Sequence, residues 1–315
     1  MKAAVISRYG SPDVLEIKEI SKPEIGKDDI LIEVHATSVN PVDWKIRSGS
    51  LKILTGRKFP KILGGDIAGI VVDKGQNVTL FNEGDEVFGK LNAFRGGAYA
   101  EYASVRSDQI AFKPRNLNFN EAATLPLAGL TAIQSLLDLG GLKKGKRVLI
   151  NGASGGVGVV AVQFSKALNA TVTGVCSSRN EELVKSLGAD NVVDYNTVDI
   201  SEMDQKFDIF FDVVAKSSFG KAKKVLDKGG IYITTVPNFT VMILGPLLNL
   251  FSSRKMEKIM VKSNPGQLKL MKEMVEAGDI VPIIDKVFTL SEIADAHREA
   301  EKGRTVGKIV VSIKD

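Results

Sequence analysis

A glycine-rich turn is the part of this sequence whose residue types and spacing point most directly to chemistry. Residues 151–158 read Asn-Gly-Ala-Ser-Gly-Gly-Val-Gly, so Ala, Gly and Gly occupy the three key positions of the pattern G-x-G-x-x-G. The apolar run 147–150 before the turn is typical of a buried strand, and 159–168 after it of an amphipathic helix. Glycine lets the backbone approach a pyrophosphate, and the start of the helix presents free N–H groups to it. We therefore predict a dinucleotide site whose pyrophosphate contacts are Ser154, Gly155, Gly156, Val157 and Gly158.

The end of the next predicted strand, 171–176, indicates which dinucleotide is bound. Proteins that bind NAD place a carboxylate for the ribose 2′-hydroxyl about 20 residues after the glycines. Here the strand runs instead into Ser177, Ser178 and Arg179. Two hydroxyls and a guanidinium suit a 2′-phosphate, because charge-assisted hydrogen bonds to phosphate are strong. We predict NADPH; the alternatives are that the serines cap the following helix and that Glu181 or Glu182 reaches a ribose.

Composition restricts the class of protein. The chain has 315 residues, which is long enough for two domains. Charged residues make up 25% and hydrophobic residues 44%, as in ordinary globular proteins. Its net charge of +5 is spread along the chain without a basic run, so we expect no nucleic-acid partner. Cys176 is the only cysteine, which excludes an internal disulfide and a cysteine-rich zinc site and fits a reducing compartment.

Targeting and membrane segments are not expected. The first residues are interrupted by Arg8 too soon for a signal peptide, so a cytoplasmic location is the expectation. The most apolar stretch, 241–251, is broken by Gly245 and Pro246, whereas a membrane span needs about 20 apolar residues. We expect this stretch to form a core, a subunit contact or the lining of an apolar cleft.

Two patterns of secondary structure divide the chain near residue 120. Before it, short strand-like runs alternate with turn signals, as in an all-β unit; they are 2–6, 14–20, 30–36, 62–72, 84–89 and 96–102. Asn120 is the expected cap of a short helix, and a longer helix covers 127–139. Beyond it, six apolar runs alternate with helical segments, at 147–150, 171–176, 191–195, 207–214, 230–236 and 258–263. That alternation predicts an α/β unit with a parallel, doubly wound sheet.

The C-terminal part contains two further predicted strands, 285–290 and 308–313, with a helix between them. Ser291 is the expected cap of that helix, which runs to residue 302. His297 lies among its charged residues, so we expect the imidazole at the surface.

Seven short segments, spread over nearly the whole chain, share their order and spacing with one family. They are 40–43 (Asn-Pro-Val-Asp), 64–69 (Gly-Gly-Asp-Ile-Ala-Gly), 97–102 (Gly-Ala-Tyr-Ala-Glu-Tyr), 127–132 (Leu-Ala-Gly-Leu-Thr-Ala), 151–158, 187–190 (Leu-Gly-Ala-Asp) and 307–311 (Gly-Lys-Ile-Val-Val). In these the chain resembles the medium-chain dehydrogenase/reductase superfamily, in its zinc-independent quinone oxidoreductase branch. The resemblance implies a GroES-like, mostly-β catalytic domain at 1–122 and 264–315, a Rossmann domain at 123–263, and a homodimer.

The resemblance also implies site residues. Asn40 and Thr131 would face the nicotinamide, and Tyr195 would lie near the 2′-phosphate unless it is an ordinary strand aromatic. Zinc dehydrogenases of this superfamily bind their catalytic metal through Cys, His and Cys or a carboxylate; here those segments offer Asn40, Asp43 and Gly64-Gly65-Asp66, so we expect no metal.

Without a Lewis acid, reduction of an activated acceptor is the expected reaction. Hydride would pass from NADPH to a quinone or, alternatively, to the β-carbon of an unsaturated carbonyl, and the protein would stabilise the resulting oxyanion. The candidate catalytic residues are Asn40, Asp43 and Tyr99; Tyr102 and Lys45 are further proton-donor candidates, and each of these aromatic or cationic side chains is otherwise a partly exposed structural residue. A third reading is a non-enzymatic NADPH-binding protein with a partner or RNA contact.

Overall fold

The computed structural model describes residues 1–92, 94–236, 249 and 252–314, so the apolar stretch 241–251 lies almost wholly outside the described residues. The chain forms two compact units. Unit 1 comprises Met1–Leu127, Ser263–Gly278 and Pro282–Asp315, and unit 2 comprises Ala128–Lys262 and Asp279–Val281. Sequence analysis places the divisions at 122/123 and 263/264, whereas the contacts divide the chain a few residues away.

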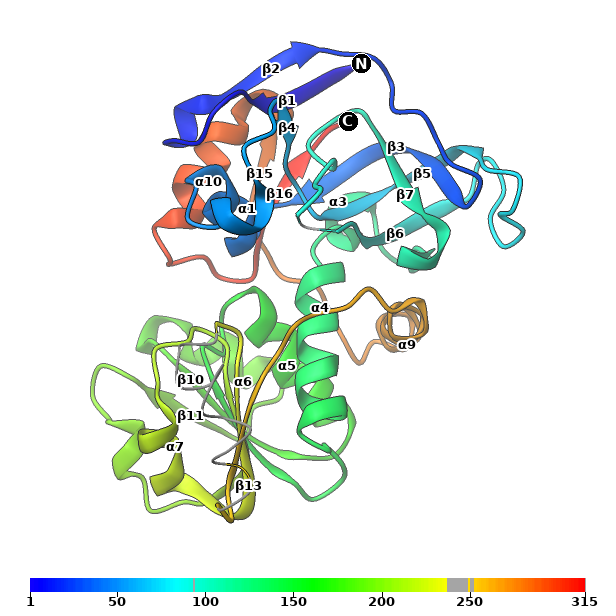
Figure 1. Ribbon diagram of the computed structural model, residues 1–315. Helices are drawn as coiled ribbons and strands as arrows, with labels where there is room; N and C mark the ends of the chain where they lie inside the picture. Colours follow the sequence, from blue (N-terminus) through cyan, green and yellow to red (C-terminus); the bar gives the residue numbers. More distant parts are fainter. Residues whose placement is uncertain (93, 237–248, 250–251, 315) are drawn as a thin grey trace. The chain divides into compact units, whose positions relative to one another are not determined.

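Unit 1 is built on a mixed sheet of seven strands (Figure 1). Its order is β15-β16-β3-β5-β6-β8, and β7 also pairs with β3. The central β3 alternates buried and half-buried residues, as predicted for a strand with one apolar face. Because β16 pairs with β3, the C-terminal segment completes the sheet begun by the N-terminal one. The strands are β3 (Asp29–Ser38), β5 (Asp66–Lys74), β6 (Glu86–Lys90), β7 (Tyr102–Arg106), β8 (Ile110–Phe112), β15 (Ile284–Thr289) and β16 (Lys308–Ser312).

A second, three-stranded sheet and five helices complete unit 1. The sheet has the order β2-β1-β4. Its strands are β1 (Lys2–Ile6), β2 (Leu15–Glu19) and β4 (Lys61–Ile62). The helices are α1 (Pro41–Arg47), α2 (Lys52–Thr55), α3 (Phe119–Ala122), α9 (Pro265–Glu276) and α10 (Ile293–Glu301). One apolar core packs α10 against strands of both sheets, with Ile6, Ile293 and Val311 at 0–1% exposure.

Unit 2 is a parallel sheet flanked by helices, which confirms the α/β prediction. The order β11-β10-β9-β12-β13-β14 reverses direction at β9, as in a doubly wound fold. Every strand pair in it is parallel. The strands are β9 (Arg147–Asn151), β10 (Thr171–Cys176), β11 (Asn191–Asp194), β12 (Phe207–Asp212), β13 (Leu226–Thr234) and β14 (Lys255–Lys258). The helices are α4 (Pro126–Ile133), continued by a π-helical turn η3 (Gln134–Leu139), α5 (Gly156–Ala167), α6 (Glu181–Ser186) and α7 (Phe219–Val225).

Several local predictions were wrong by a few residues. Asn118, not Asn120, caps α3: its side chain accepts the N–H of Glu121, whose carboxylate in turn accepts the N–H of Asn118, both at 2.9 Å. This reciprocal pair satisfies two helix donors, and Asn120 can satisfy neither. Thr289 and Glu292 form a similar box before α10, so Ser291 is not the cap. The last strand of unit 2 ends at Lys258, where the sequence suggested it would begin.

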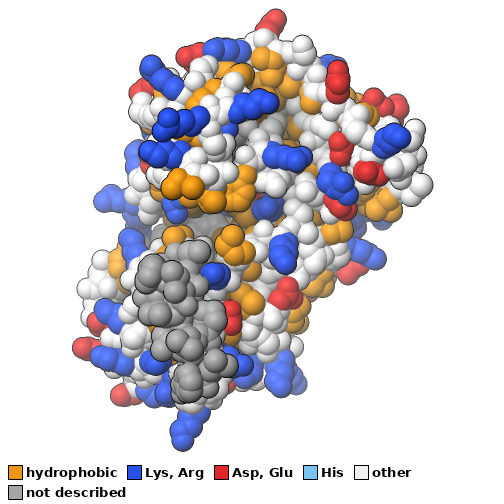
Figure 2. All heavy atoms as spheres, viewed as in Figure 1, with side chains coloured by type: hydrophobic (Ala, Val, Ile, Leu, Met, Phe, Trp, Pro, Cys, Tyr) orange, Lys and Arg blue, Asp and Glu red, His pale blue; other side chains and the backbone are white. Residues whose placement is uncertain are grey.

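Two features concern possible membrane and nucleic-acid partners: the longest apolar helical segment and the distribution of charge on the surface. Phe119–Leu139 has the length and composition of a membrane-crossing helix, which sequence analysis overlooked, but 78% of its most apolar window is buried in the protein, as in a core helix. Figure 2 shows Lys and Arg side chains dispersed among acidic and apolar ones over the described part of one face.

Candidate functional site

Two of the glycines in the turn after β9, Gly155 and Gly158, have different surroundings. A Cβ on Gly158 would lie 2.1 Å from the carbonyl oxygen of Gly152, so α5 packs against the turn too closely for any side chain. A Cβ on Gly155, the N-cap of α5, would meet nothing nearer than 3.6 Å. Space in front of Gly155 therefore gives a ligand access to the free N–H groups that begin the helix. This arrangement fits a pyrophosphate.

Ser154 links this turn to the loop after β10. Its Oγ accepts a hydrogen bond from Asn180 Nδ2 at 2.9 Å. Because the oxygen is already an acceptor there, the hydroxyl hydrogen remains to be donated to a phosphate oxygen. Gly156 and Val157 follow in the first turn of α5 and are partly exposed, so the residues predicted to bind the pyrophosphate, 154–158, are continuous along the turn and the start of the helix.

The residues expected to bind the 2′-phosphate lie at the carboxyl end of β10. Ser177 is half-buried, and Arg179 is exposed and forms no ion pair with any described residue. Tyr195 is 57% exposed and donates its N–H to the carbonyl of Cys176 at 3.2 Å, which holds it beside this loop. Ser178 is exposed, and Asp194, which ends β11 beside this loop, is a neighbouring carboxylate that was not among the predicted residues.

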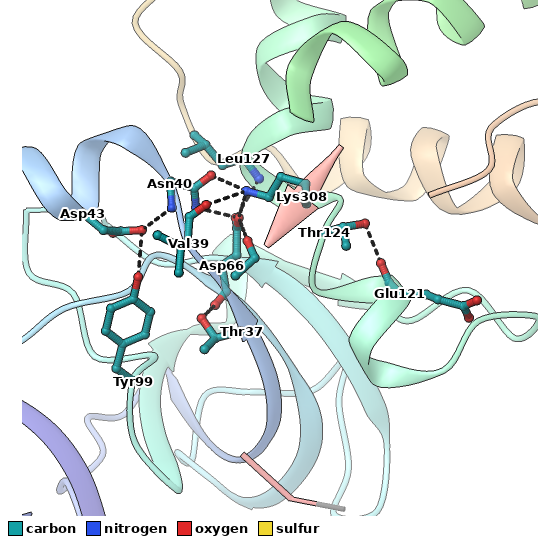
Figure 3. Close-up of polar contacts among 11 residues, drawn as sticks. Thr37, Val39, Asn40, Asp43, Asp66, Tyr99, Glu121, Thr124, Leu127 and Lys308 are labelled. Atoms are coloured by element: carbon teal, nitrogen blue, oxygen red, sulfur yellow. Dashed lines mark hydrogen bonds and ion pairs between the residues drawn. The ribbon is translucent and has the colours of Figure 1, made fainter. Parts of the chain in front are cut away.

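A buried polar network in unit 1 surrounds the side chain of Asp66, which is 0% exposed. Figure 3 shows Asn40, Asp66 and Lys308 pointing toward one another. Asp66 Oδ2 accepts from Ser38 Oγ at 2.6 Å, from Asn40 Nδ2 at 2.7 Å and from Lys308 Nζ at 3.3 Å. Asp66 Oδ1 accepts the N–H of Leu127, at the start of α4, at 2.8 Å. The carboxylate is thus held by four donors.

This network fixes the amide of Asn40 at both ends. Lys308 Nζ donates to Asn40 Oδ1 and, at 3.4 Å, to the carbonyl of Val39. Asn40 Nδ2 gives one hydrogen to Asp66, and its second hydrogen has no acceptor among the described residues. Asn40 therefore offers one oriented N–H donor. The sequence signal for this arrangement was Lys308, which begins the mostly apolar strand β16. Its side chain is only 6% exposed.

The same atoms do not fit a zinc ion. The side-chain oxygens of Asn40 and Asp66 bind the ammonium of Lys308, and a positive charge there opposes a metal cation. Zinc prefers thiolate and imidazole ligands. In residues 1–92, 94–236, 249 and 252–314, no three His, Cys, Asp or Glu side chains gather in a way that could hold a metal.

Asp43 and Tyr99 belong to a second buried chain of hydrogen bonds. Asp43 Oδ2 accepts the N–H of Asn40 at 2.8 Å, which completes the N-terminal capping box of α1, and the hydroxyl of Tyr99 at 3.2 Å. Tyr99 and His297 are both 0% exposed, and their Oη and Nε2 atoms are 3.2 Å apart. The expectations of a surface histidine and of a partly exposed tyrosine were therefore wrong. The cause lies in the fold, because α10 packs His297 into the core of unit 1.

Burial controls the protonation of this chain. It raises the pKa of Asp43 to about 7, although the hydrogen bond from Asn40 opposes the rise. It also raises the pKa of Tyr99 well above its usual value and lowers the pKa of His297 to about 3. The histidine is thus neutral at pH 7, and Tyr99 keeps its proton. Among Asp43, Tyr99 and His297, Asp43 is therefore the side chain whose pKa lies near neutrality.

The other candidate residues lie outside these clusters or in the other unit. Tyr102 donates to Glu33 at 3.0 Å and does not contact Asp43. Lys45 is half-buried, with its ammonium 5.5 Å from the ring centre of Trp44. Thr131 is 5% exposed on α4 in unit 2.

Comparison with known proteins places this geometry in a family. Residues 26–115 match the alcohol dehydrogenase GroES-like domain family, and residues 187–311 match the zinc-binding dehydrogenase family. The chain is 37% identical to the quinone-oxidoreductase QR1 of Triphysaria versicolor, over 99% of this chain and 98% of that protein. It is 36% identical to an NADPH-dependent alkenal/one oxidoreductase of Arabidopsis thaliana, over 99% of this chain and 79% of that protein. The quinone oxidoreductase structure from Coxiella burnetii superposes with a TM-score of 0.93 and 32% identity, covering 100% of this chain and 99% of that one.

Proposed function

The chain belongs to the medium-chain dehydrogenase/reductase superfamily, in its zinc-independent quinone oxidoreductase branch, and on this premise we propose that it is an NADPH-dependent reductase of quinones. Relatives named for quinone and for alkenal reduction support this reaction class. When bound, NADPH supplies the hydride. The remaining chemistry concerns how the residues of this chain hold the cofactor and accommodate the charge that develops on the acceptor.

Residues of unit 2 would hold the cofactor. Residues 154–158 offer N–H groups and the Ser154 hydroxyl to the pyrophosphate. Ser177, Arg179 and Tyr195 offer donors to the 2′-phosphate. The observation that carries the proposal is the contrast between Gly158, packed against Gly152, and Gly155, which faces open space. A phosphate-binding turn needs one glycine for close packing and another that leaves room for the ligand. A purely structural turn needs only the first.

Asn40 would stabilise the oxyanion of the reduced acceptor. Lys308 and Asp66 hold its amide from both ends, leaving one N–H to donate without reorganisation during the reaction. Asp43 acts through Asn40, since it accepts that residue's backbone N–H. We assign Tyr99 to the positioning of Asp43 rather than to proton donation, because its phenol is buried against Asp43 and His297. Solvent then supplies the proton.

Steady-state turnover tests the proposal. NADPH oxidation would be followed with a quinone and, separately, with a medium-chain 2-alkenal, using Gly155→Ala as the control that blocks the cradle. Faster turnover of the quinone, abolished in the control, is the expected result. Faster turnover of the alkenal would make the protein an enone reductase. Tight NADPH binding without turnover of either acceptor would contradict an enzymatic role and favour the binding-protein alternative.

A homodimer and a cytoplasmic location complete the proposal. Among the described residues β14 pairs only with β13, so it is an edge strand of the unit 2 sheet and is available to pair with a second copy. Light scattering on the purified protein would test the dimer: a monomeric mass at micromolar concentration would contradict it.

A further inference from the structure

Asp194 is a carboxylate at the expected 2′-phosphate site. It ends β11, and Cα pairing places it directly opposite Cys176, the last residue of β10. Parallel strands bring their carboxyl ends to one edge of the sheet, so Asp194 adjoins the loop of Ser177, Ser178 and Arg179.

The charge of Asp194 is not neutralised. Its Oδ1 accepts from the N–H and Nδ2 of Asn196 at 2.9 and 2.8 Å. All of these donors are uncharged, and within the described part of the chain Asp194 forms no ion pair. The hydrogen bonds, led by that from the Asn196 backbone, hold the pKa of Asp194 below its usual value, so the carboxylate is ionised at pH 7.

Its neighbours differ in this respect. Glu181, one of the predicted ribose ligands, is paired with Lys185 at 2.6 Å. Arg179 is a cation without an anionic partner among the described residues. Among the described residues of this loop and of the first turn of α6, Arg179 is a cation without an ion pair, and Asp194 and Glu182 are anions without one.

We propose that Asp194 determines how strongly the protein prefers NADPH over NADH. Its carboxylate repels the 2′-phosphate of NADPH and can accept a hydrogen bond from the 2′-hydroxyl of NADH. The inference rests on the proposed cofactor site and predicts that both nucleotides bind, with a modest preference set by Arg179 against Asp194.

Isothermal titration with NADP+ and NAD+ tests this directly, without any acceptor. Asp194→Asn keeps the size and hydrogen-bonding capacity of the side chain but removes its charge. Asp204→Asn is the matched control, because Asp204 is an exposed residue just before β12, at the amino end of its strand, whereas Asp194 ends β11. For Asp194→Asn we expect the Kd for NADP+ to fall about threefold to tenfold, less so at 0.5 M salt, as a screened charge effect requires. The Kd for NAD+ should stay the same or rise.

Each other outcome has a defined meaning. If Asp194→Asn raises the Kd values of NADP+ and NAD+ equally, Asp194 only supports the structure of the loop, and the inference fails. If neither Kd changes, or if Asp204→Asn changes the ratio equally, the inference also fails while the cofactor site stands. If the wild type binds neither nucleotide, the proposed function and this inference both fail.

Discussion

The buried ion pair between Lys308 and Asp66 provides the sharpest test of the network that holds Asn40. Lys308→Met would leave the Asp66 carboxylate, 0% exposed, without its cation. Removing one partner of a buried pair costs about 3–5 kcal/mol, because the remaining charge stays desolvated. Asp66→Asn should cost a similar amount, since the lysine is then unpaired at 6% exposure. The double variant removes both charges and should cost clearly less than the sum.

The assay is a double-mutant cycle in urea. Trp44 is the only tryptophan and lies in α1, so its fluorescence follows the unfolding of unit 1. We expect a coupling free energy of about 2–4 kcal/mol from the four unfolding curves. Lys18 and Glu16, an exposed pair at 2.8 Å in the same unit, provide the control cycle, Lys18→Met with Glu16→Gln, which should be additive.

Additive costs for Lys308 and Asp66, within about 0.5 kcal/mol, would refute the reasoning, because contacting charges that depend on each other cannot be additive. Additive costs would mean that Asn40 is not held by this pair.

Three further predictions follow from the same geometry. Asp43→Asn should gain stability relative to the wild type as pH rises from about 4 to about 7, by up to about 1.4 kcal/mol per pH unit. The reason is that the pKa of Asp43 is about 7 in the native state and lower in the unfolded state, so the wild type loses stability over this range. Urea unfolding of both proteins at four pH values measures this, and a difference that does not change with pH would show that the prediction is wrong. Tyr99→Phe should destabilise unit 1 by about 1–3 kcal/mol, since Asp43 and His297 each lose a buried partner, and an unchanged unfolding midpoint would disprove those bonds. Gly158→Ala should lower the melting temperature through its clash with the turn, whereas Gly155→Ala should melt like the wild type and lose NADPH binding; the reverse pattern would overturn their assigned roles.

Local patterns sufficed for the parts of the fold that depend on short-range sequence. The glycine turn, the six parallel strands and the alternating face of β3 follow from spacing and periodicity, which act within a few residues. The return of β16 to β3 was available only from family resemblance, because strands about 270 residues apart have no local signal for pairing.

The site residues missed by sequence analysis depend on tertiary packing. His297 is followed by the charged Arg298 and Glu299, but it shares a face of α10 with Ile293 and Ala296, and the packing of that face onto the core of unit 1 buries it. Asp194 looks ordinary at its strand end, and the lysine at the start of β16 does not by itself indicate which residue it binds. Tertiary pairing brings Asn40 against Lys308 and Cys176 opposite Asp194.

Turnover measured together with metal content tests the central claim most directly. Purified protein would be dialysed against a chelator, its zinc measured by mass spectrometry, and its NADPH oxidation with a quinone recorded before and after zinc is restored. We predict full activity with far less than one zinc ion per chain and no gain on adding zinc, because Lys308 occupies the oxygens of Asn40 and Asp66. Activity that disappears with the chelator and returns with zinc would contradict the account.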